Sequence, residues 1–159
     1  MKLALALREL HRSERGLAVK LDAVAARHQG DHAIRHVATD LTGWSRNHVD
    51  EIATVGRHYG LHLRWRPHVA ALSAPLQQRL SELVGRRQEP ALVLLADLRR
   101  VYQLAAGVSV DWELLAQGAQ AAKDERLLQL SQRCHPETLR QMRWANAMLK
   151  ELAPQTLTS

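Results

Sequence analysis

The stretch DLTGWSRNHVDEIATV, residues 40–55, decides the fold of this chain. Its apolar residues and those just upstream recur at steps of three and four, and His48 falls on the same row: Ile34, Val37, Leu41, Trp44, His48, Ile52 and Val55. This spacing predicts one buried stripe of an amphipathic helix. The preceding segment has an equivalent row with Glu14 inside it: Leu3, Leu7, Leu10, Glu14, Leu17, Leu21 and Val24. Two neighbouring helices are therefore each expected to bury one polar residue.

The turn signals around these rows predict two long antiparallel helices, over about 2–28 and 32–59. Gly30 is placed to end the first helix, and Asp31 to cap the second. A connection of a few residues cannot span a helix length, so the helices must lie side by side. Counted from Gly30, Glu14 lies about 16 residues back and His48 about 18 residues on. At about 1.5 Å per residue they are level to within one turn, so Glu14 and His48 are predicted to face each other.

The rest of the chain predicts two more long helices, over about 90–122 and 124–152, after a crossover with a short helix at 76–85. Pro90 takes a first-turn position, where its missing N–H costs nothing. The predicted buried row of the third helix is Leu94, Leu98, Val101 (or Tyr102), Ala105, Val108, Trp112, Leu115 and Ala119. That of the fourth is Leu128, Ser131, His135, Leu139, Met142, Asn146 and Leu149, with a kink expected at Pro136 and fraying from Pro154. Residues 1–159 are thus predicted to form one all-α, four-helix domain.

Composition narrows the class of protein. The chain is 46% hydrophobic and 24% charged, as in globular domains, and it has no Phe, which favours helices with a core of Leu, Ala and Val. Its charge of +6 comes mostly from arginines spread over all segments, so we interpret them as solvated helix faces and do not expect a nucleic-acid partner. The lone Cys134 suits a reducing cytoplasm. The apolar run before Arg8 is too short for a signal peptide, and no run of about 18 apolar residues predicts a membrane span, so we expect a cytoplasmic protein.

Three stretches resemble the ferritin-like superfamily, in particular its rubrerythrin-related and small bacterial stress-associated bundles: HRSERGLAVKL around Glu14, HVDEI at 48–52 and AAKDERLLQLSQRC at 121–134. The resemblance implies a ferritin-like four-helix bundle with one long crossover between the second and third long helices. It also implies a di-iron centre, in which two helices each supply one Glu and two each supply Glu-x-x-His.

The ligands of such a centre are incomplete here. Glu14 matches the first-helix glutamate and His48 the second-helix histidine, but Ser45 stands where the glutamate three residues before His48 is expected. In the fourth helix Gln132 takes the glutamate position before His135, and the third helix offers no Glu on its row, with Tyr102 or Asp111 nearest. One carboxylate cannot balance two iron ions, so no complete di-iron site is predicted.

Two interpretations of Glu14, His48 and His135 follow. They form either a single-metal site for iron or zinc, since His2Glu is a common ligand set, or a buried hydrogen-bonded cluster without a cofactor. The metal site would belong to a mononuclear metal protein with redox or hydrolytic chemistry. The metal-free cluster would belong to a non-enzymatic binding or assembly protein that forms homo-oligomers or binds an unknown protein partner.

Two surface motifs carry weaker signals. His32 and His36 are one turn apart and are interpreted as a solvated pair, with adventitious metal binding as the alternative. LRWRPH, residues 63–68, alternates arginine with Trp65; we interpret it as Trp65 packing on the bundle end, with stacking on nucleotides as the alternative. A third hypothesis is therefore an anion or nucleic-acid binder that uses the arginines, with an affinity that falls steeply with salt.

Overall fold

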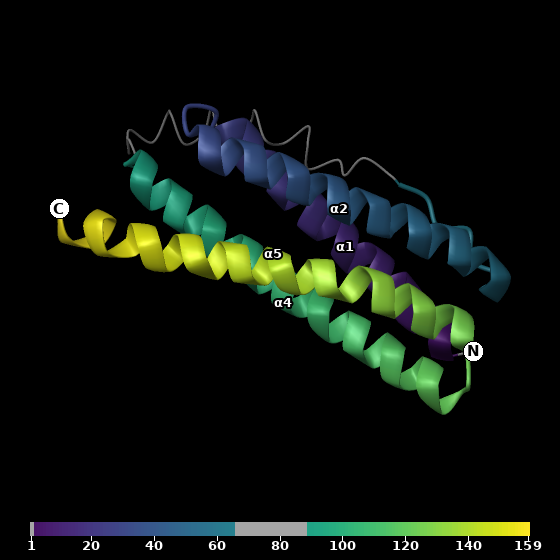
Figure 1. Ribbon diagram of the computed structural model, residues 1–159. Helices are drawn as coiled ribbons and strands as arrows, with labels where there is room; N and C mark the ends of the chain where they lie inside the picture. Colours follow the sequence, from purple (N-terminus) through teal and green to yellow (C-terminus); the bar gives the residue numbers. More distant parts are fainter. Residues whose placement is uncertain (1, 66–88) are drawn as a thin grey trace.

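The computed structural model describes residues 2–65 and 89–159, and in these ranges it contains four long helices and no strand (Figure 1). The helices are α1 (Lys2–Arg27), α2 (His32–Gly56), α4 (Pro90–Ala121) and α5 (Glu125–Thr158), with a 3-10 turn η1 (Arg57–Tyr59) after α2. The all-α prediction is confirmed for the described residues. The predicted helix at 76–85 and the middle of the crossover lie outside them, and the ferritin-like assignment stays a prediction.

Local signals place both ends of α2 as predicted, whereas α1 already ends at Arg27 and Gly30 does not have the positive φ of a glycine stop. The side chain of Asp31 accepts a hydrogen bond of 3.0 Å from the backbone N–H of Ile34, which satisfies one free donor of the first turn of α2. Gly60 has a φ of 73°, a left-handed conformation that glycine adopts without steric cost, and it ends the helical stretch. The helix predicted over 32–59 is therefore α-helical to Gly56 and 3-10 over its last turn.

The four helices pack as two antiparallel hairpins, with α1 against α2 and α4 against α5, and further contacts join α1 to α4 and α2 to α5. At one end Asp97, near the start of α4, binds the side chain of Arg27 at the end of α1. At the other end the hydroxyl of Tyr59 donates a 2.5 Å hydrogen bond to Asp124, the N-cap of α5. α2 therefore ends at the opposite end of the bundle from the start of α4 (Figure 1).

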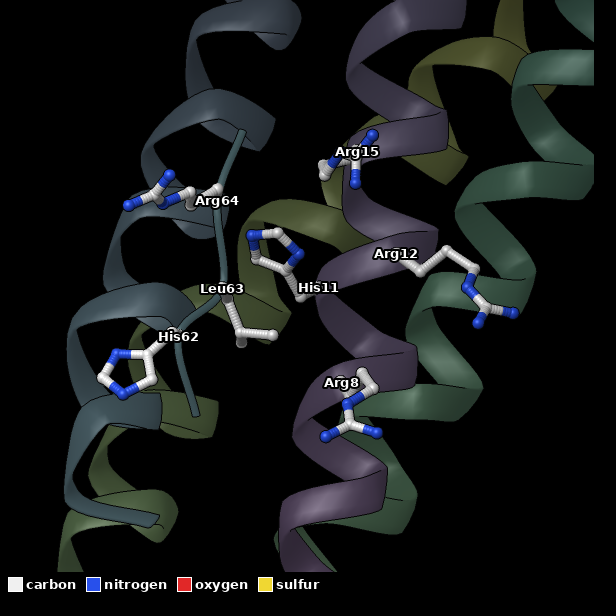
Figure 2. A pocket seen from close by; sticks show the side chains of 7 residues that line it. All are labelled: Arg8, His11, Arg12, Arg15, His62, Leu63 and Arg64. Carbon is white, nitrogen blue, oxygen red and sulfur yellow. The ribbon is translucent and has the colours of Figure 1, made fainter. Parts of the chain in front are cut away.

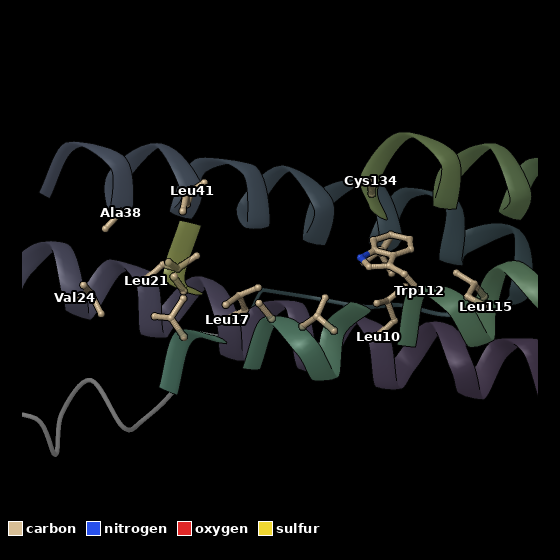
Figure 3. Close-up of a cluster of buried hydrophobic side chains, with 14 of the residues drawn as sticks. Leu10, Leu17, Leu21, Val24, Ala38, Leu41, Trp112, Leu115 and Cys134 are labelled. Carbon is tan, nitrogen blue, oxygen red and sulfur yellow. The ribbon is translucent and has the colours of Figure 1, made fainter. Parts of the chain in front are cut away.

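The core is built from aliphatic side chains and one tryptophan. All eight residues of the predicted α4 row are buried, with Val101 at the position that Tyr102 could have taken. The fully enclosed Trp112 lies near Leu10 of α1 and Cys134 of α5 (Figure 3). Burying a leucine contributes about 1.5–3 kcal/mol, so these rows stabilise the bundle. The largest fully buried apolar side chains are Trp112, Leu7, Leu10, Leu17, Leu21, Ile52, Leu98, Leu115, Leu127 and Leu130.

The predicted row of α5 is wrong by one position along the helix. The buried residues are Leu127, Leu130, Ser131, Cys134, Thr138, Gln141 and Ala145. Apart from Ser131, the residues predicted to be buried, among them His135 and Leu139, are only partly buried. A row that runs through His135 therefore does not face the core, because packing against the other helices turns Cys134 and Thr138 inward.

The predicted end of α5 near Leu152 is also wrong, because the helix continues to Thr158 with Pro136 and Pro154 inside it. A proline removes one i→i−4 hydrogen bond and crowds the preceding turn. At Pro154 the missing bond is to the carbonyl of Lys150 alone, and the last turn gains a 2.7 Å bond from the Thr158 hydroxyl to the carbonyl of Pro154. The described chain is therefore helical to Thr158.

Candidate functional site

Glu14 and His48 meet in the middle of the bundle, as predicted. Nδ1 of His48 lies 2.8 Å from Oε1 of Glu14, and both side chains are fully enclosed. They come from α1 and α2, whose short turn fixes the pairing of these two positions. A charged carboxylate this far from water requires hydrogen bonds or an opposite charge, and the imidazole supplies one of them.

A second helix pair completes the surroundings of Glu14. The indole N–H of Trp112, on α4, donates a 2.9 Å hydrogen bond to Oε1 of Glu14, and the hydroxyl of Thr138, on α5, lies 3.4 Å from the same oxygen. The Trp112 ring meets the His48 ring edge to face, with centroids 6.0 Å apart. Oε2 of Glu14 is buried and has no hydrogen-bond partner among the described residues. All four helices therefore contribute a side chain to this centre.

The other nitrogen of His48 is also occupied. Nε2 lies 2.7 Å from Oε2 of Glu137, on α5, whose side chain is 33% exposed and so reaches the surface. Burial by itself lowers the pKa of His48, but the hydrogen bonds and charges of Glu14 and then of Glu137 outweigh it and raise the pKa above its ordinary value. When the ring is protonated, it donates one hydrogen bond to each carboxylate, and the three residues then form a hydrogen-bonded chain from the core to the surface.

One turn further along the bundle lies a neutral polar layer. The side-chain amide of Gln141, on α5, donates to the hydroxyl of Ser45 at 2.9 Å and to the carbonyl of Leu41 at 3.0 Å, both on α2. Ser45 is the position at which the family resemblance expects a metal-bridging glutamate. An amide and a hydroxyl carry no negative charge to offset a cation, and their hydrogen bonds engage each other instead.

His135 does not join Glu14 and His48. Its Nε2 forms a 2.8 Å hydrogen bond with the hydroxyl of Ser109 on α4, and its Nδ1 lies 3.8 Å from Glu113. The predicted trio is thus not brought together. Within residues 2–65 and 89–159, no group of three or more His, Cys, Asp or Glu side chains is arranged to hold a metal ion. The residues in the centre do not fit the di-iron cofactor that the resemblance implies.

A second buried carboxylate, missed by sequence reasoning, lies near the start of α4. Asp97 is 4% exposed and binds Lys20 at 2.6 Å, Arg27 at 2.9 Å and His28 at 2.8 Å, all three on or just after α1. Burial raises the pKa of Asp97, but the hydrogen bonds from Lys20 and His28 outweigh burial and lower the pKa below its ordinary value. This network ties α4 to the end of α1.

Sequence reasoning also missed Glu137, Thr138 and Gln141, because it rotated α5 by one position. A usable signal was present: Cys134, Thr138, Gln141 and Ala145 recur at steps of four, three and four. Small and polar residues on such a row indicate a helix face that packs closely on a polar centre. α5 has no strongly apolar row like those of the other helices, so its sequence pattern does not distinguish this row from the one that runs through His135.

The comparisons with known proteins give no relative from which a role could be transferred. No family model matches this chain, and neither a curated protein nor a solved structure gives a significant match. None of the helices in the described part of the chain combines the length and the apolar character needed to cross a membrane.

Proposed function

We propose that this protein is a non-enzymatic helical bundle that acts by binding or assembly, and that its Glu14–His48–Glu137 chain is a metal-free centre that fixes the arrangement of the helices. The observation that carries this proposal is that both ring nitrogens of His48 lie within 2.8 Å of a carboxylate oxygen. An imidazolium that donates from both nitrogens has no lone pair for a metal ion.

The energetic argument favours a structural role for this centre. Breaking a buried ion pair by removing one partner is strongly destabilising, whereas a mispaired helix register would leave Glu14 or His48 buried without its partner. The native register is therefore favoured over registers shifted along the helices. Glu137 extends the same constraint to α5, and Trp112 extends it to α4.

A mononuclear metal centre remains the second candidate because Oε2 of Glu14 has no partner in the described part of the chain. Metal binding at Glu14 and His48 would require His48 to lose its proton and its hydrogen bond to one carboxylate. His135 would in addition have to leave Ser109, to which it is bound at 2.8 Å. These rearrangements make the metal-free centre the better supported of the two.

Elemental analysis distinguishes the two candidates. The protein, purified without chelators or an affinity tag, is measured beside His48→Ala and a double variant, His32→Ala/His36→Ala, which removes a surface histidine pair stacked at 6.3 Å. We expect no stoichiometric metal in the wild type, or only metal that is lost in the double variant. About one ion per chain that is lost in His48→Ala and kept in the double variant would overturn the proposal.

The assembly part of the proposal rests on an exposed apolar pair on α4. Val110 and Leu114 lie one turn apart, and they are 57% and 63% exposed in the single chain. Light scattering on the same sample tests this part. A mass above the 17.9 kDa of one chain supports a homo-oligomer, and a monomer at all accessible concentrations contradicts it.

A further inference from the structure

A basic pocket opens between α1 and the extended segment 61–65 that follows η1 (Figure 2). Its volume is about 200 Å³, and the described residues that line it include four arginines, two histidines and no acidic residue. They are Arg8, His11, Arg12, Arg15, His62, Leu63 and Arg64. A concave surface lined by one sign of charge attracts ions of the opposite sign.

The wall opposite α1 is held in place by the core. Leu61 is buried, and its backbone N–H donates a 3.0 Å hydrogen bond to the carbonyl of Gly56. Leu63 packs against the core from the same segment. A Cβ on Gly56 would lie 3.2 Å from Cδ1 of Leu63, so the missing side chain is what allows this close approach. Leu61 is buried and Leu63 is partly buried, whereas the alternate residues His62 and Arg64 are exposed and form the outer rim.

The floor of the pocket carries an unsatisfied polar group. His11 is only 3% exposed, and its Nε2 is buried with no hydrogen-bond partner among the described residues. Figure 2 shows its ring pointing from α1 toward the extended segment, between the side chains of Arg8 and Arg15. Burial and the charge of Arg15 lower the pKa of His11, against a weaker opposing effect of Asp50. Leaving a buried polar atom unpaired is costly, so a ligand that accepts a hydrogen bond here would relieve that cost.

We propose that this pocket binds the phosphoryl group of a small phosphorylated molecule. Guanidinium groups bind phosphate oxygens through paired N–H donors, and Nε2 of His11 donates one more hydrogen bond in the tautomer that has its proton on this nitrogen. A phosphate monoester carries about −1.5 to −2 charge, which matches several arginines better than a single carboxylate does. The pocket is smaller than the roughly 300–1,000 Å³ of sites for drug-sized ligands, so it fits a phosphoryl group with a short substituent.

The arginines of the pocket differ in how they can serve a ligand. Glu9 pairs with Arg12 at 3.3 Å, and in Figure 2 the Arg12 side chain turns away from the opposite wall, so Arg8 on α1 and Arg64 on the opposite wall are assigned as the cations for the ligand. The proposal goes beyond the metal-free bundle and does not depend on it, because phosphate binding uses neither Glu14 nor His48. Its failure would leave the metal analysis unchanged.

Phosphate titration followed by NMR tests the proposal, with inorganic phosphate as the probe. The variant is Arg8→Gln/Arg64→Gln, and the matched control is Arg99→Gln/Arg100→Gln, which makes the same change in net charge at exposed α4 residues that do not line the pocket. We expect saturable amide shifts in the wild type, a loss of affinity of about tenfold or more in the variant, and a change within about twofold in the control.

Three results would overturn the proposal. The first is no saturable binding of phosphate at millimolar concentrations, and the second is an equal loss in both double variants, which would show a non-specific charge effect. The third is a result with a short single-stranded oligonucleotide that binds more tightly than phosphate. If its affinity falls steeply with salt and is reduced by the Arg8→Gln/Arg64→Gln change, the pocket is a nucleic-acid site. Amide shifts that are confined to residues 8–15 and 61–64, and that are lost in Arg8→Gln/Arg64→Gln but not in the control, support the proposal.

Discussion

A Glu14→Gln substitution removes the buried negative charge of the central cluster while preserving the size of the side chain. In the native bundle Oε1 of Glu14 accepts hydrogen bonds from His48 and Trp112, and Oε2 has no partner in the described part of the chain. The glutamine oxygen can replace Oε1. Its amide group then occupies the place of Oε2, a buried position at which the native side chain has no hydrogen-bond partner among the described residues.

Two costs follow from this geometry. The bond to His48 loses its charge-assisted character, which contributes about 1.5–3 kcal/mol, and an unpaired buried amide adds about 1–3 kcal/mol. Allowing for relaxation around Glu14, we expect the free energy of unfolding to fall by about 2–4 kcal/mol. This is a large part of the roughly 5–15 kcal/mol that stabilises a typical domain.

The same substitution alters the pH dependence of stability. The pKa of His48 is raised in the folded protein, because the hydrogen bonds and charges of Glu14 and Glu137 exceed the effect of burial. A raised folded-state pKa contributes stability that is fully present below the unfolded value of 6.5 and is lost as the pH rises through the folded-state pKa. Glu14→Gln is expected to reduce this loss, so the gap in stability between wild type and variant narrows as the pH rises.

Urea unfolding followed by far-ultraviolet circular dichroism measures both effects across this pH range. Glu9→Gln is the matched control, because it makes the same chemical change on the same helix at a side chain that is 56% exposed. Its surface pair with Arg12 predicts a change below about 0.5 kcal/mol. Equal stabilities of the two variants, or a gap that widens as the pH rises, would refute the assignment of Glu14 and His48 as a charged buried pair.

Two further predictions concern the rest of the core. Asp97→Asn should destabilise the protein at neutral pH by about 2–3 kcal/mol, because it weakens the bonds to Lys20 and Arg27. Burial raises the pKa of Asp97, but the hydrogen bonds from Lys20 and His28 outweigh burial and lower the pKa overall. The stability that Asp97 contributes is therefore present above the unfolded-state pKa of 3.8 and is lost as the pH falls through the folded-state pKa. Acid unfolding curves of the variant and the wild type should converge in that pH range. Burial, together with the nearby charges of Glu51 and Glu14, raises the pKa of the Cys134 thiol to about 12. A thiol-reactive disulfide reagent should therefore label the folded protein at least about 1,000-fold more slowly than the urea-unfolded chain. Comparable labelling rates would contradict the burial of Cys134.

The sequence alone determined the helical class, the ends of α2 and the approach of Glu14 to His48. These features depend on local physics: rows of apolar residues at steps of three and four, an aspartate cap at Asp31 and a short turn near Gly30. When two helices are joined by so short a turn, equal distances from it bring residues level. The contact between Glu14 and His48 therefore followed from counting residues along two helices.

The rotation of α5 and the partners of buried charges were decided only by the tertiary structure. A weakly apolar helix has several rows that local patterning cannot rank, and packing against α2 and α4 selected the one that carries Thr138 and Gln141 and places Glu137 beside His48. Asp97 has its partners about 70 residues away in the chain, so no local pattern marks it as buried. The basic pocket likewise joins α1 to the segment 61–65, which come together because Leu61 and Leu63 are drawn against the core.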